Sequence, residues 1–156
     1  TEEAFIAGLI HDIGKLIMDQ YIHNYYKQVS KGINQNEQLM RTVEQEQFGF
    51  SHDEMGELIV AHWNFPSILS KAVRYHHNPI KVKGIEHLFV SIIHLGNIIS
   101  LALDLGQSGE SFVPTLDNSA WQALGLKTSD LDSIFEATLE EYNNAQEFLT
   151  VIISEE

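Results

Sequence analysis

The chain has 156 residues, a length that suits a single domain with a buried hydrophobic core. Hydrophobic residues make up 44% and charged residues 20%, as in ordinary soluble proteins, and the absence of cysteine excludes disulfides and thiolate zinc sites. The formal net charge is −13, and residues 104–156 contain eleven acidic side chains against one basic side chain, Lys127. A field of this sign repels phosphate backbones, so we expect no binding to nucleic acid.

No segment predicts a membrane span or a signal peptide. The longest apolar run, residues 88–103, is too short for a span and contains four polar residues, Ser91, His94, Asn97 and Ser100, so it predicts a buried helix. The sequence opens with Thr1-Glu2-Glu3 rather than with methionine, which suggests a fragment or a processed form. We therefore expect a cytoplasmic protein.

Apolar residues at helical spacing predict a first helix over residues 2–20. They form one stripe that we expect to be buried, made of Phe5, Leu9, Ile13, Leu16 and Ile17. A second helix is predicted over residues 21–31 with Gly32 as its C-cap. A third follows through residue 47, capped by Asn34 or Asn36, and ends at Gly49.

Ser51 and Glu54 form the pattern of a capping box, so a fourth helix is predicted to begin there and to end at Trp63. Pro66 suits the first turn of a fifth helix that runs to His77, and a sixth, apolar almost all round, covers residues 85–105. Residues 107–116 form a candidate linker.

A short helix follows over residues 117–124, and a last helix is capped by Ser129 and Asp132. Its heptad stripe favours packing on its own domain over pairing with a second copy, because three heptads are marginal for a coiled coil. No strand alternation appears, so the sequence predicts an all-α fold.

The first predicted helix places two adjacent polar residues, His11 and Asp12, between isoleucines. A carboxylate in such surroundings is costly unless it is paired or binds a metal. The sequence His-Asp-x-Gly-Lys at residues 11–15 resembles the signature of the HD superfamily of metal-dependent phosphohydrolases.

Three later segments follow in matching order: Ser-His-Asp-Glu-Met-Gly at 51–56, His-Trp-Asn-Phe-Pro at 62–66 and Arg-Tyr-His-His-Asn-Pro at 74–79. The succession is similar to the HDOD domain, an HD-related output domain of bacterial signalling proteins, over about residues 3–105. The resemblance implies an HD-like bundle of about seven to eight helices. We expect a core over residues 1–106 and an acidic helical extension, 107–156, packed on it.

The resemblance also implies the site residues. His11 and Asp12 match the metal-binding pair, Lys15 matches a residue that can face a substrate phosphate, and the additional ligands of some relatives match His52, His76 and His77. Asp12 and Lys15 would be the catalytic residues of an active enzyme. Imidazoles and carboxylates suit a divalent Fe, Mn or Zn ion.

Two features depart from the pattern of an active enzyme. Asn97 stands where the superfamily has a ligating Asp; its amide keeps an oxygen donor for a metal but loses the charge. The upstream His of the family would precede residue 1, and His77 leads into Asn-Pro-Ile rather than the Gly-Tyr-Pro of the HD-type cyclic-di-GMP phosphodiesterases. HDOD proteins commonly have eroded ligand sets, which implies a regulatory or interaction role.

Three functions therefore stay open. The first is a non-catalytic module of bacterial signal transduction that acts by contacts with a signalling protein or an upstream domain. The second is a metal-dependent phosphohydrolase acting on a phosphodiester or a nucleotide. The third is a metal or nucleotide held as a structural or sensing ligand, so that chelation would lower the melting temperature.

The remaining histidines and aromatic residues have plainer interpretations. We expect His23, His62 and His87 at the surface. His94 is expected to be a hydrogen-bonded core residue, with a supporting role at the metal site as the alternative. Three aromatic residues are expected to anchor the core, namely Trp63, Tyr75 and Trp121.

Overall fold

The computed structural model describes residues 2–36, 38–106, 108–110 and 112–154, apart from the side chains of 24–28, 30–36 and 152–154. The described residues form helices and no strands, so the predicted all-α, HD-like fold is confirmed. Eight of these helices are α-helical: α1 (Glu2–Ile10), α2 (Ile13–Asn36), α3 (Met40–Phe48), α4 (His52–His62), α5 (Ser67–Tyr75), α6 (Gly84–Ala102), α7 (Asn118–Leu124) and α8 (Leu131–Ser154). Two short 3₁₀ turns, η1 (Pro79–Lys81) and η2 (Thr128–Asp130), complete the set.

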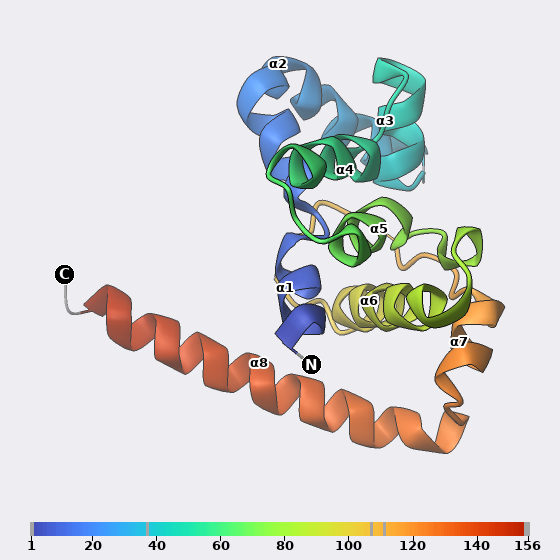
Figure 1. Ribbon diagram of the computed structural model, residues 1–156. Coiled ribbons are helices and arrows are strands. Elements are labelled where there is room, and N and C mark those ends of the chain that lie inside the picture. The colour runs from blue at the N-terminus through green and yellow to red at the C-terminus, as the bar shows by residue number, and fades with distance from the viewer. Residues whose placement is uncertain (1, 37, 107, 111, 155–156) are drawn as a thin grey trace. The chain divides into compact units, whose positions relative to one another are not determined.

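The chain divides into two compact units, Thr1–Leu124 and Gly125–Glu156. In the N-terminal unit, α1, α5 and α6 pack on one another, and α4 joins them to α2 and α3 (Figure 1). One core cluster, centred on Met18 and Val43, lies among the helices α2, α3 and α4, and the other, centred on Ala7 and Ile93, lies between α1, α5 and α6. The predicted division at residue 106 and the packing of the extension stay predictions.

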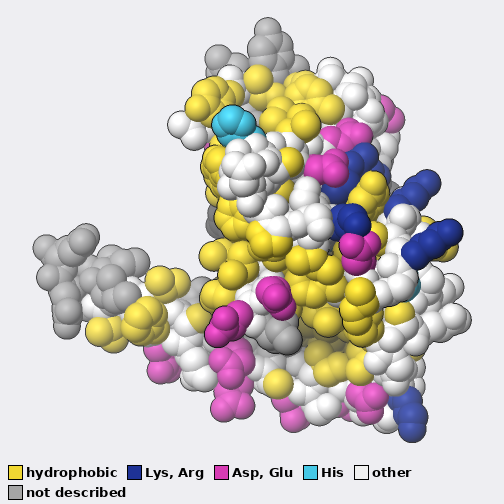
Figure 2. Space-filling model, in the orientation of Figure 1, with side chains coloured by type: hydrophobic (Ala, Val, Ile, Leu, Met, Phe, Trp, Pro, Cys, Tyr) yellow, Lys and Arg dark blue, Asp and Glu magenta, His cyan; other side chains and the backbone are white. Residues whose placement is uncertain are grey.

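The predicted first helix is wrong in one respect that matters for the site. The chain leaves the helix at His11 and Asp12, and α2 starts in a new direction at Ile13. The predicted buried stripe is also wrong: Phe5 and Leu9 are each 75% exposed and Leu16 is 67% exposed, and other hydrophobic side chains also lie at the surface of this unit (Figure 2). Ala7 on α1 and Met18 on α2 are the buried residues instead.

The boundaries of the next helices also differ from the prediction. The helix α2 runs on past Gly32, with a kink at Ile22, so Gly32 is not a C-cap. Leu39 is the N-cap of α3, so neither predicted asparagine caps that helix. Gly49 ends α3 in the left-handed conformation at φ 76°, as predicted, because glycine adopts this conformation without steric cost.

The capping box of α4 is confirmed, with the Ser51 backbone N–H donating to Glu54 Oε2 at 3.0 Å. This helix ends at Trp63 as predicted, but Trp63 itself is 52% exposed, so its predicted role as a core anchor is wrong. Tyr75 and Trp121 are half-buried. The helix α5 ends at Tyr75, two residues before the predicted end, and His76 is its C-cap.

The helix α6 is long and apolar enough to cross a membrane by length and composition alone. Its buried polar side chains nevertheless bond to protein groups: Ser91 donates to the carbonyl of His87, and His94 bonds the carbonyl of His76. The core helix of a soluble protein can have the same length and composition.

The C-terminal unit consists of η2 and the long helix α8. The predicted cap is displaced, because Asp130 rather than Asp132 accepts the capping hydrogen bond, from the Lys127 N–H at 2.8 Å. Ser129 lies inside η2. Whether the heptad stripe of α8 packs on its own chain or on a second copy stays a prediction.

Candidate metal centre

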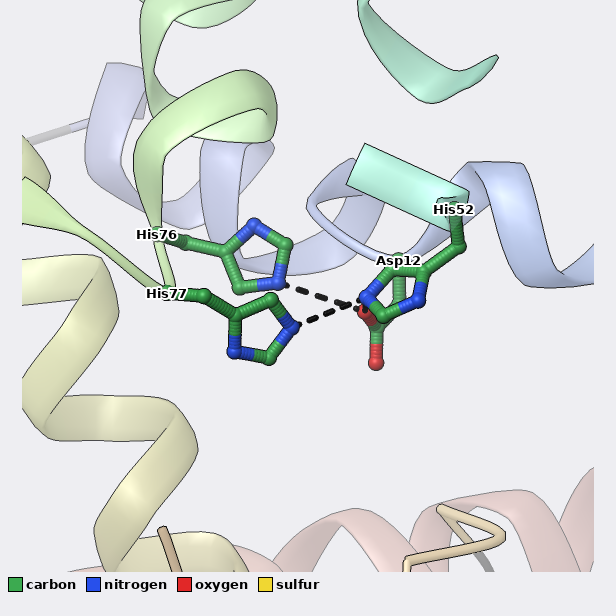
Figure 3. Close-up of side chains that lie close together, drawn as sticks. All are labelled: Asp12, His52, His76 and His77. Atoms are coloured by element: carbon green, nitrogen blue, oxygen red, sulfur yellow. Dashed lines mark hydrogen bonds and ion pairs between the residues drawn. The ribbon is translucent and has the colours of Figure 1, made fainter. Parts of the chain in front are cut away.

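Four predicted ligands come together in the N-terminal unit. Asp12, His52, His76 and His77 each offer one donor atom, and these atoms lie within 4.8 Å of one another (Figure 3). They come from the turn between α1 and α2, the first residue of α4, and the end of α5. Residues that the family pattern places in order along the sequence thus also lie close together in space.

Two glycines let the three backbone segments approach closely enough to form this cluster. A Cβ atom on Gly14 would lie 2.0 Å from the backbone oxygen of His52, and one on Gly56 would lie 2.6 Å from Val73 Cγ1. The start of α2 therefore rests directly on the start of α4, and α4 rests on α5. Gly14, the glycine of the His-Asp-x-Gly-Lys sequence, is therefore needed for the close packing of α2 on α4, which the sequence alone does not reveal.

Three imidazoles are held in one orientation by a bond to the ring nitrogen Nδ1. His11 Nδ1 lies 2.7 Å from the carbonyl oxygen of Gly8, and His76 Nδ1 lies 2.7 Å from that of Val73. His52 Nδ1 lies 2.6 Å from a carboxylate oxygen of Glu44. Because these oxygens only accept, Nδ1 carries the proton in each ring, and in a neutral ring Nε2 is left with a free lone pair.

Two of these lone pairs lie near a carboxylate, and His52 Nε2 also lies 2.9 Å from His77 Nε2. His52 Nε2 and His76 Nε2 lie 3.4 and 3.5 Å from Asp12 Oδ1. Among the described side chains, Asp12 Oδ1, His76 Nε2 and His11 Nε2 are buried atoms with no hydrogen-bond partner. Each such atom costs about 1–3 kcal/mol when it is left unsatisfied. A divalent cation would satisfy imidazole nitrogens and a carboxylate oxygen together, so the residues present fit a metal.

The electrostatics of the cluster favour ligand-competent protonation states. Burial lowers the pKa of His76 to about 4 and also holds the pKa of His77 well below its ordinary value. Burial acts to raise the pKa of Asp12, but the neighbouring His76 and the charge of Lys15 outweigh it, and this pKa lies well below its ordinary range. At neutral pH these histidines are neutral and Asp12 is ionised.

The second oxygen of Asp12 has different neighbours. Lys15 Nζ lies 2.8 Å from Asp12 Oδ2, and His11 Nε2 lies 3.4 Å from it. Lys15 also donates to the backbone oxygen of Ser108 at 3.4 Å. The ammonium group thus neutralises Asp12, and the predicted contact of Lys15 with a substrate phosphate stays a prediction.

Asn97 lies on α6 and lines a mostly apolar cavity of about 300 Å³, together with His11 and six other residues. Its predicted role as a ligand stays a prediction.

Glu44 is a supporting residue that the sequence analysis missed. Its carboxylate is fully buried and accepts both from His52 Nδ1 at 2.6 Å and from the His52 backbone N–H at 2.9 Å. A carboxylate behind an imidazole fixes the ring and raises its basicity, which is the usual arrangement at metal sites. The signal in the sequence is only a glutamate eight residues before His52, on a different helix.

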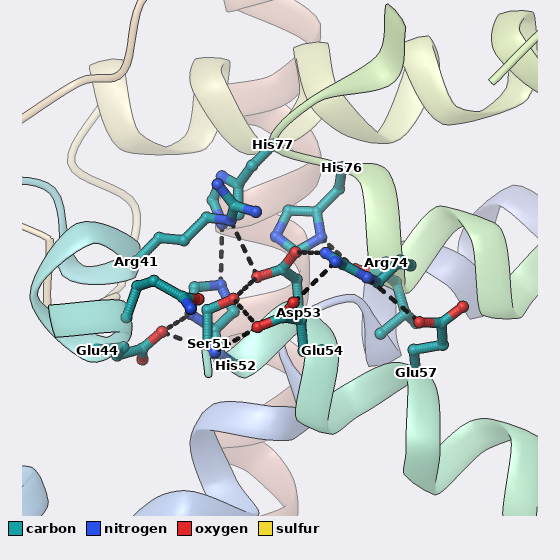
Figure 4. A network of polar contacts seen from close by, with 12 residues as sticks. Arg41, Glu44, Ser51, His52, Asp53, Glu54, Glu57, Arg74, His76 and His77 are labelled. Atoms are coloured by element: carbon teal, nitrogen blue, oxygen red, sulfur yellow. Dashed lines mark hydrogen bonds and ion pairs between the residues drawn. The ribbon is translucent and has the colours of Figure 1, made fainter. Parts of the chain in front are cut away.

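A second buried network lies beside the cluster and was also missed. Asp53, 1% exposed, accepts from Arg41 Nε at 3.0 Å and from Arg74 (Figure 4). Arg74 also reaches Glu54 at 2.9 Å and Glu57 at 3.2 Å. These ion pairs join α3, α4 and α5, the helices that bring His52 and His76 together.

The other histidines mostly follow the sequence analysis. His23 and His62 are exposed, as predicted. His87 is half-buried and lies 2.9 Å from the Pro79 carbonyl oxygen, so its predicted surface position is wrong. His94 is a buried, hydrogen-bonded core residue, as predicted.

Comparison with protein families gives one match, in which the family model of the HDOD domain covers residues 1–79. No curated protein matches the sequence at a significant level.

Three solved structures resemble the fold. A structure named "HDOD domain protein with unknown function" from Geobacter sulfurreducens has a TM-score of 0.76 and 19% identity, and covers 91% of this chain and 52% of its own. A "Putative signal transduction protein" from Marinobacter aquaeolei VT8 has a TM-score of 0.77 and 18% identity, and covers 94% and 32%. A "Putative phosphohydrolase" from Shewanella amazonensis SB2B has a TM-score of 0.66 and 19% identity, and covers 87% and 50%. The chain thus spans about a third to a half of their lengths.

Proposed function

Because the chain belongs to the HDOD domain family, we propose that it is a regulatory module of bacterial signal transduction that holds a divalent cation and acts by protein contacts. The observation that carries the cation is the pair of buried, unsatisfied atoms Asp12 Oδ1 and His76 Nε2, with the unsatisfied Nε2 of His11 lying outside the group of four. With no thiolate in the donor set, the cation is Fe, Mn or Zn, held by Asp12, His52, His76 and His77. Bound, it supplies positive charge at Asp12 Oδ1.

The regulatory role is supported by what the site lacks for turnover. Asn97, in place of the Asp of the superfamily, offers no charge, and it lines a cavity together with His11. Lys15 is engaged by Asp12 and Ser108. The Marinobacter structure is named for signal transduction, which agrees with this proposal. We propose a cytoplasmic protein whose partner is a signalling protein or an upstream domain, with a homodimer through α8 as a further candidate.

A metal-dependent phosphohydrolase is the second candidate. It is favoured by Lys15, whose ammonium group lies 2.8 Å from Asp12 and would meet a phosphate with little movement, and by the name of the Shewanella structure. In that case Asp12 would hold the cation and Lys15 would bind the phosphoester. Reaction with a chromogenic phosphodiester in the presence of Mn²⁺ tests it. Hydrolysis that Asp12→Ala abolishes would favour the enzyme over the regulatory module.

Elemental analysis of the purified protein tests the cation itself. We expect near-stoichiometric Fe, Mn or Zn in the wild type and its loss in Asp12→Ala. Asp19→Ala is the matched control, because Asp19 is an exposed carboxylate on α2 that pairs only with the exposed His23 among the described residues. Wild type without metal after reconstitution with each of the three ions would contradict the proposal.

Chelation gives an independent measurement. A cation at a hundred times its dissociation constant stabilises the folded state by about 2.7 kcal/mol. We therefore expect EDTA to lower the melting temperature of the wild type and of Asp19→Ala, and to leave that of Asp12→Ala unchanged. An identical shift in all three proteins would mean that EDTA acts elsewhere.

A further inference from the structure

We propose that His94 is a positioning residue for the metal centre, because it holds the carbonyl group between His76 and His77 and ties it to the start of α7. The inference rests on the proposed function, since it concerns the residues that would hold the cation. It goes beyond that function by assigning a task to a buried histidine on another helix.

The two hydrogen bonds of His94 fix its tautomer. His94 Nδ1 lies 2.7 Å from the backbone oxygen of His76, and the Asp117 backbone N–H donates to His94 Nε2 at 3.0 Å. Since Nε2 accepts, Nδ1 must carry the proton and donate it to His76. The ring is 3% exposed, and both of its nitrogens have a hydrogen-bond partner.

The His76 carbonyl is the group through which this bond can act. It belongs to the peptide bond that joins His76 to His77, immediately after the last residue of α5. A peptide unit is planar, so a bond that fixes its oxygen also fixes the direction from one Cα atom to the next. The two imidazoles that depend on this direction lie 4.0 Å apart between ring centres.

His77 depends on the backbone more than His76 does. The ring of His76 has its own bond from Nδ1 to the Val73 carbonyl. Among the hydrogen bonds described, the ring of His77 has only the contact of its Nε2 with His52 Nε2 at 2.9 Å, inside the cluster itself. The position of this ring therefore follows its backbone, which is held by the bond from His94 to the His76 carbonyl and by the turn bond from the Asn78 N–H to the Tyr75 carbonyl at 2.8 Å.

The helix α6 makes a second link between this segment and α7 through His87, seven residues before His94. His87 lies 2.9 Å from the Pro79 carbonyl oxygen and 3.4 Å from the Ser119 carbonyl oxygen. Asp117, whose N–H contacts His94, accepts through Oδ1 from the backbone N–H of Ser119 at 2.7 Å. The α6 histidines thus hold the segment 76–79 against the start of α7 at two points, and only His94 reaches a proposed ligand.

Two conservative substitutions separate the two bonds of His94. The side-chain amide of His94→Asn places an N–H group near the position of Nδ1 and keeps the bond to His76. The longer amide of His94→Gln places an oxygen near Nε2, so it keeps the bond to Asp117 and loses the bond to His76. Each variant loses one hydrogen bond, so a purely structural role predicts similar changes for both.

The affinity for Zn²⁺ is measured by competition with a chromophoric chelator on EDTA-stripped protein, beside a thermal melt. We expect His94→Gln to bind about 10- to 100-fold more weakly, as is usual when a supporting partner of a ligand is lost, and His94→Asn to stay within about threefold of the wild type. His87→Gln, on the same helix, is expected to lower the melting temperature without changing the affinity. Equal affinities in the two His94 variants would overturn the proposal.

A measurement on the wild type keeps the test independent of the variants and of the metal. Long-range ¹H–¹⁵N NMR correlation reports the tautomer of each histidine, and we expect the Nδ1–H tautomer for His94 in metal-free protein at pH 7. The Nε2–H tautomer or an imidazolium would overturn the positioning role. A wild type that binds no Zn²⁺ but shows the expected tautomer would instead contradict the proposed cation and leave the bond to His76 established.

Discussion

His52 and Asp53 are neighbours in the first turn of α4, and both are buried, yet they belong to clusters of opposite character. The oxygens of Asp53 accept from Ser51, Arg41 and Arg74. Across the turn, His52 faces a cluster in which Asp12 Oδ1 and His76 Nε2 have no hydrogen-bond partner among the described residues. Burial of polar groups is therefore not the mark of a functional site in this protein.

A functional site is better indicated by rings that are held in fixed orientations while buried atoms beside them lack hydrogen-bond partners. His11, His52 and His76 are each held at Nδ1, so their rings are not free to turn toward other acceptors or donors. Most buried polar groups in native proteins are satisfied, and exceptions call for an explanation such as an ion. The Asp53 network holds the helices, and the cluster around Asp12 would hold a ligand.

Gly14→Ala is expected to have the largest effect on stability. The added methyl group would push α2 away from α4, the helix that carries residues of both clusters. The new Cβ would lie 2.0 Å from the His52 carbonyl oxygen and 2.9 Å from the Gly56 nitrogen, both backbone atoms that cannot move aside. We expect a loss on the order of 4 kcal/mol in the free energy of unfolding, measured by urea titration.

Gly8→Ala is the matched control for this substitution. Its Cβ would meet no atom within 4 Å among the described residues, and alanine is favoured over glycine inside a helix by about 0.5–1 kcal/mol. The control should therefore be slightly stabilising. A Gly14→Ala variant as stable as the wild type would show that α2 and α4 are not in contact here.

Arg74→Gln tests the Asp53 network, in which the buried carboxylate has hydrogen-bond partners. It leaves the buried carboxylate of Asp53 with Arg41 as its remaining cation, and breaking a buried ion pair costs about 3–5 kcal/mol. We expect a loss toward the lower end of this range, because Arg41 stays in place. Lys71→Gln breaks a partly exposed pair with Glu86 at 2.6 Å and should cost less than about 1 kcal/mol.

The two substitutions should differ in a second measurement as well. Because Arg74 touches no member of the group of four in the described structure, the protein that remains folded should bind Zn²⁺ as the wild type does. A large loss of affinity in folded Arg74→Gln protein would mean that the two clusters are one functional unit, and the comparison would fail.

Local signals in the sequence predicted local structure well. Ser51 and Glu54 predicted the start of α4, and Gly49 predicted the end of α3. Both predictions succeeded because helix caps depend on residues that are close together in the chain. The break at His11 was not predictable from periodicity, since apolar residues continue at helical spacing on both sides of it. Only contact with α4, through Gly14, shows why the chain turns there.

The candidate site divides in the same way. The sequence named Asp12, His52 and the His76–His77 pair because their order matches a known family, not because spacing places them together. It missed Glu44 and Arg74, whose partners are 8 and 21 residues away on other helices. Such residues carry no local pattern, since a buried partner is defined by tertiary packing alone.

As the pH falls, the two clusters should lose their contributions to the free energy of unfolding in different pH ranges. The ordinary pKa of histidine, 6.5, applies to the unfolded chain, whereas His76 in the folded protein has a pKa of about 4. Between these values the unfolded chain binds a proton that the folded protein does not, so stability from His76 is complete above pH 6.5 and is lost as the pH falls to about 4. Each such proton changes the free energy of unfolding by about 1.4 kcal/mol per pH unit.

Asp53 behaves differently because its pKa in the folded protein lies below the ordinary 3.8: burial acts to raise it, but the bonds from Ser51 and Arg41 outweigh burial. Its contribution is complete above pH 3.8 and is lost only below that value, as is that of Asp12. Urea titrations of metal-free protein from pH 7 to pH 3 should therefore show a slope that begins near pH 6.5. His76→Gln should lower this slope by about one proton and leave the contribution of Asp53 below pH 3.8 unchanged. An unchanged slope in the variant would mean that His76 is not held neutral by the fold, and the contrast between the two sides of α4 would then rest on geometry alone.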